Sequence, residues 1–236
     1  MPRVLLYIVI VSMLTYITHA QHNLPAVETQ QISGKSENNN SSSEIKVYEK
    51  LFKKSFGYQR KEHMQVIKRL QKIDSYERLY KMIMVLGEKM IDVIEASKAL
   101  IENGGFNPDN RTLPRNVTIQ SAISTTLENT AFFGDIILHF PHITHRILRT
   151  QQIWNPIIHW SLNFMNRTKY LLDTETVERF HLVSQELNIV KREPEYFNPY
   201  WHSAESRKEY KGEAKKKKST RKEKQKRGPQ ITKVEL

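Results

Sequence analysis

Three histidines at steps of three residues, His139, His142 and His145, form the cluster whose residue types best suit metal binding. On one helix, His142 and His145 would lie a turn apart, where both imidazoles can bind the same cation. Pro141 places His139 at or before the helix start, and no nearby Cys, Asp or Glu completes a usual ligand set. We therefore expect exposed or partly buried imidazoles, with no bound metal and no cofactor.

Two carboxylates, Glu128 and Asp135, lie seven residues apart and would share one face of a helix. Paired carboxylates serve in general acid–base catalysis, but capping and surface roles explain these two better. The chain has no Gly-x-Ser-x-Gly elbow, no glycine-rich phosphate loop, no dinucleotide fingerprint and no His-Glu-x-x-His motif. It also has no cysteine, which excludes thiol–disulfide exchange, thiolate nucleophiles and Cys-based zinc sites. We predict that the protein is not an enzyme.

The N-terminus has the layout of a cleaved signal peptide. Arg3 precedes an almost entirely apolar run, Val4–Ile17, and small residues at positions 18 and 20 precede Gln21. The run is shorter than the roughly 20 residues that a membrane-spanning helix needs, which argues against a signal anchor. We expect cleavage between Ala20 and Gln21 and no membrane span in the mature chain.

The last four residues, Lys233-Val234-Glu235-Leu236, differ from Lys-Asp-Glu-Leu only at the second position. Retrieval to the endoplasmic reticulum (ER) depends on the free carboxylate, the preceding acidic side chain and a basic group four residues from the end. Together with the signal peptide, these residues predict a protein of the ER lumen that the KDEL receptor returns there. Secretion is the alternative localisation.

Five Asn-x-Ser/Thr sequons become usable if the chain enters the lumen, where the glycosylating enzyme acts. The predicted glycosylation sites are Asn39, Asn40, Asn110, Asn116 and Asn166. We expect the glycan at Asn166 to stay in the high-mannose form, because a retrieved protein returns to the ER.

Most of the net charge of +12 belongs to the C-terminal tail. Arg207–Leu236 holds thirteen Lys and Arg residues and four acidic residues, a net charge of +9. Arg3 leaves with the signal peptide, so Gln21–Ser206 carries only +2. The main interpretation therefore includes no nucleic-acid partner. The basic run Lys215–Arg227 also matches a nuclear localisation pattern, which a secretory protein would not normally use.

Hydrophobic periodicity predicts an all-α helical bundle. A helix should begin at position 44, be weakened or interrupted at Gly57, and break or kink near Asp74. The next helix carries a heptad seam and ends at Asn103-Gly104-Gly105, and its seam residues are Leu79, Ile83, Leu86, Met90, Val93, Ser97 and Leu100. We favour a partner helix within the same chain over a coiled-coil dimer. Further helices are expected at about 117–139, 142–150, 156–171 and 174–188.

These sequence patterns predict four parts of the chain: signal peptide 1–20, disordered polar leader 21–43, helical domain 44–200, and disordered basic tail 201–236. Bulky aromatic residues are candidate binding anchors, but most should lie in the bundle core: Phe132, Phe133, Phe140, Trp154 and Trp160. Gly134 should allow a close approach between helices.

The segment Leu127–Pro141 (LENTAFFGDIILHFP) resembles the signature of the coiled-coil domain-containing protein 134 family. The resemblance extends in the same order over roughly 44–236, and its other landmarks are the heptad helix, Trp154-Asn155 with Trp160, the Asn166 sequon, Gln185-Glu186-Leu187, Asn198-Pro199 and Arg227-Gly228-Pro229-x-Ile231. This chain departs from the family in its longer Asn-rich leader, its sequons at Asn110 and Asn116, and its terminal tetrapeptide.

The resemblance implies an ER-luminal adaptor associated with the translocon and oligosaccharyltransferase. There the family shields a nascent ER Hsp90-type chaperone from hyperglycosylation. Secreted and nuclear activities are also attributed to the family, including dampened MAP-kinase signalling and contact with a transcriptional adaptor. The alternatives for this chain are therefore a secreted, cytokine-like or MAP-kinase-modulating signalling protein, and a nuclear interaction protein.

Overall fold

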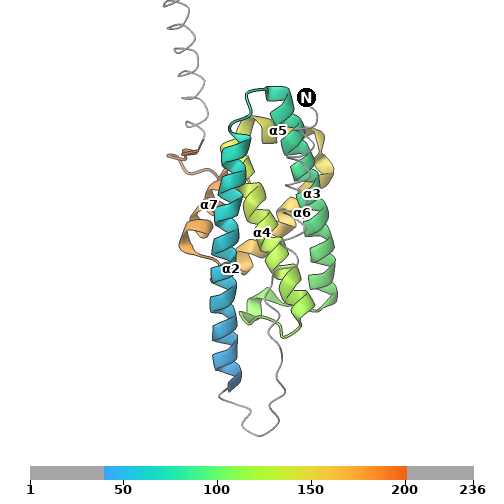
Figure 1. Ribbon diagram of the computed structural model, residues 1–236, viewed down its shortest axis with the longest axis vertical. Coiled ribbons are helices and arrows are strands. Elements are labelled where there is room, and N and C mark those ends of the chain that lie inside the picture. Colours follow the sequence, from blue (N-terminus) through green and yellow to red (C-terminus); the bar gives the residue numbers. More distant parts are fainter. Residues whose placement is uncertain (1–39, 201–236) are drawn as a thin grey trace, which may run out of the picture. The chain divides into compact units, whose positions relative to one another are not determined.

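The computed structural model describes residues 40–200, and within this range the chain forms six α-helices, three short 3-10 helices and no strands (Figure 1). The predicted all-α fold is confirmed. The helices are α2 (Asn40–Leu70), α3 (Tyr76–Asn103), η1 (Pro108–Asn110), α4 (Val117–His139), α5 (Pro141–Thr150), η2 (Gln152–Trp154), α6 (Asn155–Arg167), η3 (Lys169–Leu171) and α7 (Thr174–Glu186).

The expected signal peptide, its cleavage site at Ala20, the basic tail and the terminal tetrapeptide lie outside the described residues. The first turn of α2 begins at Asn40, four residues before the expected helix start. The compact unit that holds the helices ends at Tyr196, and Phe197 opens a second unit, described only through Tyr200.

Helix α4 lies at the centre of the first unit (Figure 1). It packs against α2, α3, α5, α6 and α7. Every residue of the Leu127–Pro141 segment is buried except Asn129, which is half-buried. A helix covered on all sides cannot have a polar solvent face, which explains why its polar positions are mainly small or paired residues.

Helix α2 continues through Gly57, so the expected interruption is wrong. Glycine costs about 1 kcal/mol relative to alanine inside a helix. Burial of Phe52 and Phe56, which lie one turn apart just before Gly57, offsets this cost, because both rings enter the core beside α4. The break near Asp74 is confirmed, but the cap of α3 is Ser75, whose Oγ accepts a hydrogen bond from the Arg78 N–H.

The heptad helix is confirmed as α3, and its partner is α4 of the same chain. The buried members of the expected seam are Ile83, Leu86, Met90 and Ser97. Toward the C-terminus the seam is shifted by one residue: Leu100 is 47% exposed, whereas Ile94 and Ile101 are buried. A straight α-helix has 3.6 residues per turn, so a strict heptad drifts by about 20° per repeat, and the contact moves to neighbouring positions.

The C-terminal helices begin largely where their proline and capping residues predict. Pro141 and Pro156 lie in the first turns of α5 and α6. Asp173 caps α7 by accepting a hydrogen bond from the Thr176 N–H at 2.7 Å. The expected helix at 156–171 ends as an α-helix at Arg167 and continues as η3 after Thr168.

Four of the five candidate aromatic anchors are buried core residues, in agreement with the expectation that most would be. Phe132, Phe133, Phe140 and Trp154 are buried, and half-buried Trp160 stacks on Phe164 with ring centroids 5.2 Å apart. None of the five is therefore a fully exposed binding anchor.

Candidate functional site

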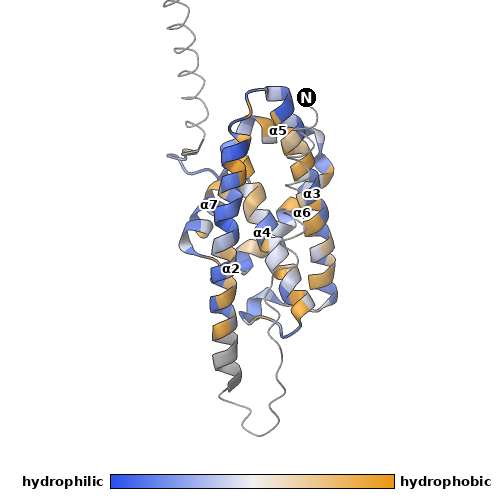
Figure 2. Ribbon diagram, viewed as in Figure 1, coloured by the Kyte–Doolittle hydropathy of each residue, from blue (hydrophilic) through white to orange (hydrophobic). Residues whose placement is uncertain are grey.

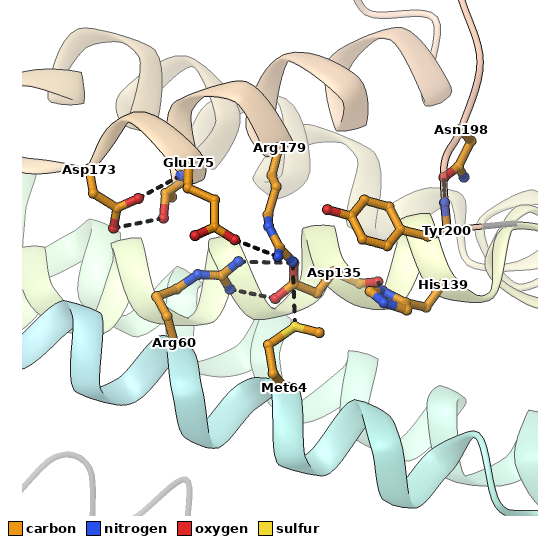
Figure 3. A network of polar contacts seen from close by, with 10 residues as sticks. Arg60, Met64, Asp135, His139, Asp173, Glu175, Arg179, Asn198 and Tyr200 are labelled. Atoms are coloured by element: carbon orange, nitrogen blue, oxygen red, sulfur yellow. Dashed lines mark hydrogen bonds and ion pairs between the residues drawn. The ribbon is translucent and has the colours of Figure 1, made fainter. Parts of the chain in front are cut away.

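A cluster of charged side chains joins three helices inside the bundle (Figure 3). Asp135 of α4 is 1% exposed and accepts hydrogen bonds from Arg60 of α2, including one of 2.9 Å from Nη2 to Oδ1. Arg179 of α7 approaches the same Oδ1 at 3.4 Å and donates to Glu175 at 2.7 Å. Two guanidinium groups thus pair with the buried carboxylate of Asp135, while the Glu175 side chain, 74% exposed, pairs with Arg179 at the edge of the cluster.

The hollow beside this cluster is small. Its volume of about 10 Å³ has room for roughly a single water molecule. Apolar residues form much of its wall, including Ala131, Leu162, Met165 and Val183. Close approach of α7 to Gly134 narrows it further, because a Cβ on this glycine would lie 3.0 Å from a methyl carbon of Val183. The predicted close packing at Gly134 is confirmed.

His63 of α2 lies next to the charged cluster and stacks on Phe132 with centroids 4.6 Å apart. Burial lowers the pKa of His63 to about 3, and the positive charge of Arg60 acts in the same direction. Its Nδ1 is buried and has no hydrogen-bond partner within the described part of the chain. The imidazole is therefore neutral at physiological pH.

Glu128 lies two helical turns before Asp135 on α4, but the two carboxylates have separate surroundings. The Ser124 hydroxyl donates to Glu128 Oε1 at 2.9 Å. Burial raises the pKa of Glu128 to about 7, and the Ser124 hydrogen bond opposes this shift only in part. The expected surface and capping roles are wrong for both carboxylates, since Glu128 is 7% exposed and Asp135 is 1% exposed. Arginine pairing holds Asp135 as an acceptor, which leaves no shared acid–base site.

The three histidines of the metal-like run have different surroundings. The Asp135 carbonyl oxygen can only accept, so His139 donates to it from Nδ1, at 2.8 Å. His145 Nε2 lies 3.0 Å from Glu186 Oε1, while His142 is exposed on α5. Within residues 40–200, no group of three or more His, Cys, Asp or Glu side chains is arranged to hold a metal ion.

The sequons differ in how the folded chain presents them. Asn110 and Thr112 are both exposed around η1, whereas the Asn116 side chain caps α4 by accepting from the Thr118 N–H at 2.9 Å. Asn166 is exposed, but its partner Thr168 is fully buried. Asn39 lies outside the described residues, and Asn40 is described only as the first residue of α2.

Arg60, His63 and Arg179 are not among the residues that the sequence motifs indicated as candidates. A signal for two of them was present in α2: Phe56, Arg60, His63 and Ile67 follow four-, three- and four-residue steps, the spacing of one helical face. Charged or polar residues on an apolar stripe indicate buried partners. No local signal, however, connects them with Asp135 or Arg179.

No helix within the described residues combines the length and hydrophobicity needed to cross a membrane.

Comparison with known proteins gives one family. The sequence profile of the family described as "ERK and JNK pathways, inhibitor" matches residues 36–232. Two relatives, both named Coiled-coil domain-containing protein 134, are similar to this chain: one from Xenopus tropicalis is 33% identical over 150 residues, and one from Mus musculus is 30% identical over 151 residues. The alignments cover 64% of this chain and 65% and 66% of the relatives, slightly less than two thirds of their length. No solved structure matches the chain.

Proposed function

We propose that this chain, which belongs to the family described as "ERK and JNK pathways, inhibitor", is a non-catalytic adaptor of the ER lumen. It acts at the translocon and oligosaccharyltransferase, where it protects a nascent ER Hsp90-type chaperone from hyperglycosylation. One observation carries the non-catalytic part of this proposal: Asp135, the most deeply buried carboxylate of α4, is held by Arg60 and Arg179, and the hollow that it lines has a volume of only about 10 Å³. Such a core is suited to supporting a binding surface.

Two sequence features support the compartment. The apolar run before Ala20 directs the chain into the secretory pathway, and Lys233–Leu236 returns it to the ER through the KDEL receptor. Similarity to the two proteins named Coiled-coil domain-containing protein 134 supports the adaptor role.

Depletion of the protein from its own cells tests this function. The ER Hsp90-type chaperone should then migrate more slowly on gels, and enzymatic removal of all N-glycans should abolish the difference. Re-expression of the full chain should restore normal mobility, and so should the Asn166→Gln variant, because the partner contacts come from the helical body. Unchanged chaperone mobility after depletion would contradict the adaptor role.

Deletion of Lys233–Leu236 tests the localisation separately. The truncated protein should accumulate in the medium, whereas the full chain should stay in the cell with glycans sensitive to endoglycosidase H. Equal secretion of both forms would show that the tetrapeptide is not read.

The family description favours a second candidate function, inhibition of ERK and JNK signalling by a secreted form. Purified mature protein added to the medium of stimulated cells should then lower ERK and JNK phosphorylation within minutes to hours. The same treatment with heat-denatured protein is the control. Phosphorylation that responds only to intracellular depletion would instead link signalling to the ER adaptor role.

A further inference from the structure

Helix α2 has a second face that no other described helix covers. Its inner face packs on α4 through residues such as Phe52. On the opposite side Val47, Leu51 and Tyr58 are 57%, 44% and 64% exposed. At 100° per residue these three side chains fall within about 40° of one another. In Figure 2, hydrophobic and hydrophilic segments alternate along this N-terminal part of α2.

Spacing along this outer face matches that of a helix-binding surface. Val47, Leu51, Lys54 and Tyr58 follow steps of four, three and four residues, as do the contact positions of a coiled coil. The helix is already anchored to the bundle by its inner face, so its outer face needs no partner for folding. Exposed apolar side chains at this spacing are suited to a helix from another protein.

This face and its border are strongly basic. The exposed cationic residues here are Lys50, Lys54, Lys61, Lys68 and Arg69 on the face and Lys53 beside it. No ion pair found among the described residues includes any of these six side chains. The acidic residues of this stretch, Glu49 and Glu62, are only half-exposed, and Glu62 accepts a hydrogen bond from Gln65 at 2.9 Å. A rise of 1.5 Å per residue places Lys50 and Arg69, the first and last of these residues, about 28 Å apart along the helix.

We propose that the outer face of α2, defined by Val47, Leu51, Lys54, Tyr58 and Lys61, binds an acidic amphipathic helix of a partner protein. This inference rests on the adaptor function proposed above and adds the surface and the chemistry of the partner. The partner helix places apolar side chains against Val47, Leu51 and Tyr58, while its Glu and Asp residues pair with the flanking lysines. Opposite charges at such flanking positions set both the choice and the orientation of a helical partner.

Charge decides against two other occupants. The chain's own tail, Arg207–Leu236, carries a net charge of +9 and is repelled by this face. A second copy bound through the same face would bring two sets of unpaired lysines together. An anionic bilayer is less suitable because the apolar stripe ends at Tyr58, and the following outward positions are Lys61, Gln65 and Lys68.

Binding of a synthetic peptide tests the proposal on the full mature chain. The probe has four heptads with Leu at the a and d positions and Glu at e and g, and a second probe has Lys at e and g. We expect the Glu peptide to bind with an affinity that falls with salt, and the Lys peptide not to bind. The double variant Lys54→Glu/Lys61→Glu should weaken binding about tenfold.

A matched control keeps the same change in net charge. Lys81→Glu/Lys89→Glu alters two exposed lysines of α3 and should bind like the wild type. Leu51→Ser/Tyr58→Ser keeps the charge and should also weaken binding. All these side chains are exposed, so circular dichroism should show unchanged helicity for each variant.

Three results would overturn the proposal. Binding that survives the α2 variants but disappears on removal of residues 207–236 would assign the peptide to the tail. Binding to phosphatidylserine vesicles but not to the Glu peptide would assign the face to a membrane. A dimer that Leu51→Ser/Tyr58→Ser dissociates would assign it to a second copy.

Rescue in depleted cells separates this inference from the adaptor function. If depletion changes chaperone mobility and Lys54→Glu/Lys61→Glu restores it as well as the wild type does, the α2 surface is wrong while the adaptor function stands. If depletion changes nothing, the adaptor function itself fails, whatever the peptide measurements give.

Discussion

Arg60 and Asp135 are 75 residues apart in the chain, yet their side chains meet through two contacts, one from each Nη atom of the guanidinium. The pair connects α2 to the central helix α4, and Arg179 adds α7 to the same carboxylate (Figure 3). A buried carboxylate without its cationic partners, or two buried guanidinium groups without their anion, is strongly unfavourable. The cluster therefore favours one arrangement of the three helices.

Replacement of Asp135 by Asn tests the role of this cluster. It leaves Arg60 and Arg179 close together without the charge that balances them, and should lower the free energy of unfolding by about 3–5 kcal/mol. Urea denaturation of both proteins at neutral pH measures the change. Asp109→Asn is the control, because the Asp109–Arg167 pair is exposed, and its stability should match the wild type. Similar losses in both variants would show that the buried location of Asp135 has no special effect.

His63 should make the protein sensitive to acid. Its pKa is about 3 in the folded state and near 6.5 when unfolded, so below pH 6.5 the unfolded state binds a proton that the folded state does not. This linkage costs roughly 2 kcal/mol of stability between pH 6.5 and 5. His63→Phe keeps a ring against Phe132 and removes the effect. Its stability relative to the wild type should therefore rise by that amount over the same range, as measured by denaturation at a series of pH values.

Glu128 should have the opposite pH dependence. Its pKa is raised to about 7 in the folded state, so its contribution is most favourable below pH 4.5 and is lost as the pH rises through 7. Glu128→Gln keeps an oxygen acceptor for Ser124 and removes the titration. Relative to the wild type, the variant should gain roughly 3 kcal/mol between pH 4.5 and 8. A difference that does not change with pH would show that Glu128 has an ordinary pKa in the folded protein.

Replacing a glycine by alanine should change stability in opposite directions at a closely packed position, Gly87, and at an open position, Gly57. A Cβ at Gly87 would lie 2.9 Å from Cζ3 of Trp154, and we expect Gly87→Ala to destabilise the protein by about 1–3 kcal/mol. Gly57 has no atom within 4 Å of an added Cβ and lies inside α2. Gly57→Ala should thus stabilise the protein by about 0.5–1 kcal/mol, since alanine favours helix. Thermal unfolding followed by circular dichroism distinguishes the two signs.

The Asn166 sequon should be modified only before the bundle folds. The Thr168 hydroxyl, which the glycosylating enzyme must reach, is buried and donates to the Phe164 carbonyl at 2.8 Å. Unglycosylated mature protein made in bacteria can be offered to oligosaccharyltransferase either folded or unfolded. We expect Asn110 to be glycosylated in both cases and Asn166 only in the unfolded chain. Mass spectrometry of each site measures this, and equal modification of Asn166 in both states would contradict it.

The sequence by itself determined the helical class, the order of the elements and most of their ends. Hydrophobic spacing defines α2 and α3, while Pro141, Pro156 and Asp173 mark helix starts through interactions within one turn. These are local effects, so a single chain segment contains the information. The wrong prediction at Gly57 shows the limit of local information. The free-energy cost of glycine in a helix is a local property, but the burial of Phe52 and Phe56 that offsets it comes from contact with the rest of the bundle.

Only the tertiary structure decided which polar residues are buried and what holds them. Glu128 and Asp135 are spaced like residues of one helix face, which the sequence alone suggested to be exposed, but α4 is covered on all sides. Burial therefore raises the pKa of Glu128, and Asp135 pairs with Arg60 and Arg179. Burial and charge pairing depend on distances between helices that are remote in sequence. Residue types and spacing within one helix cannot specify those distances, whereas packing of the complete bundle does.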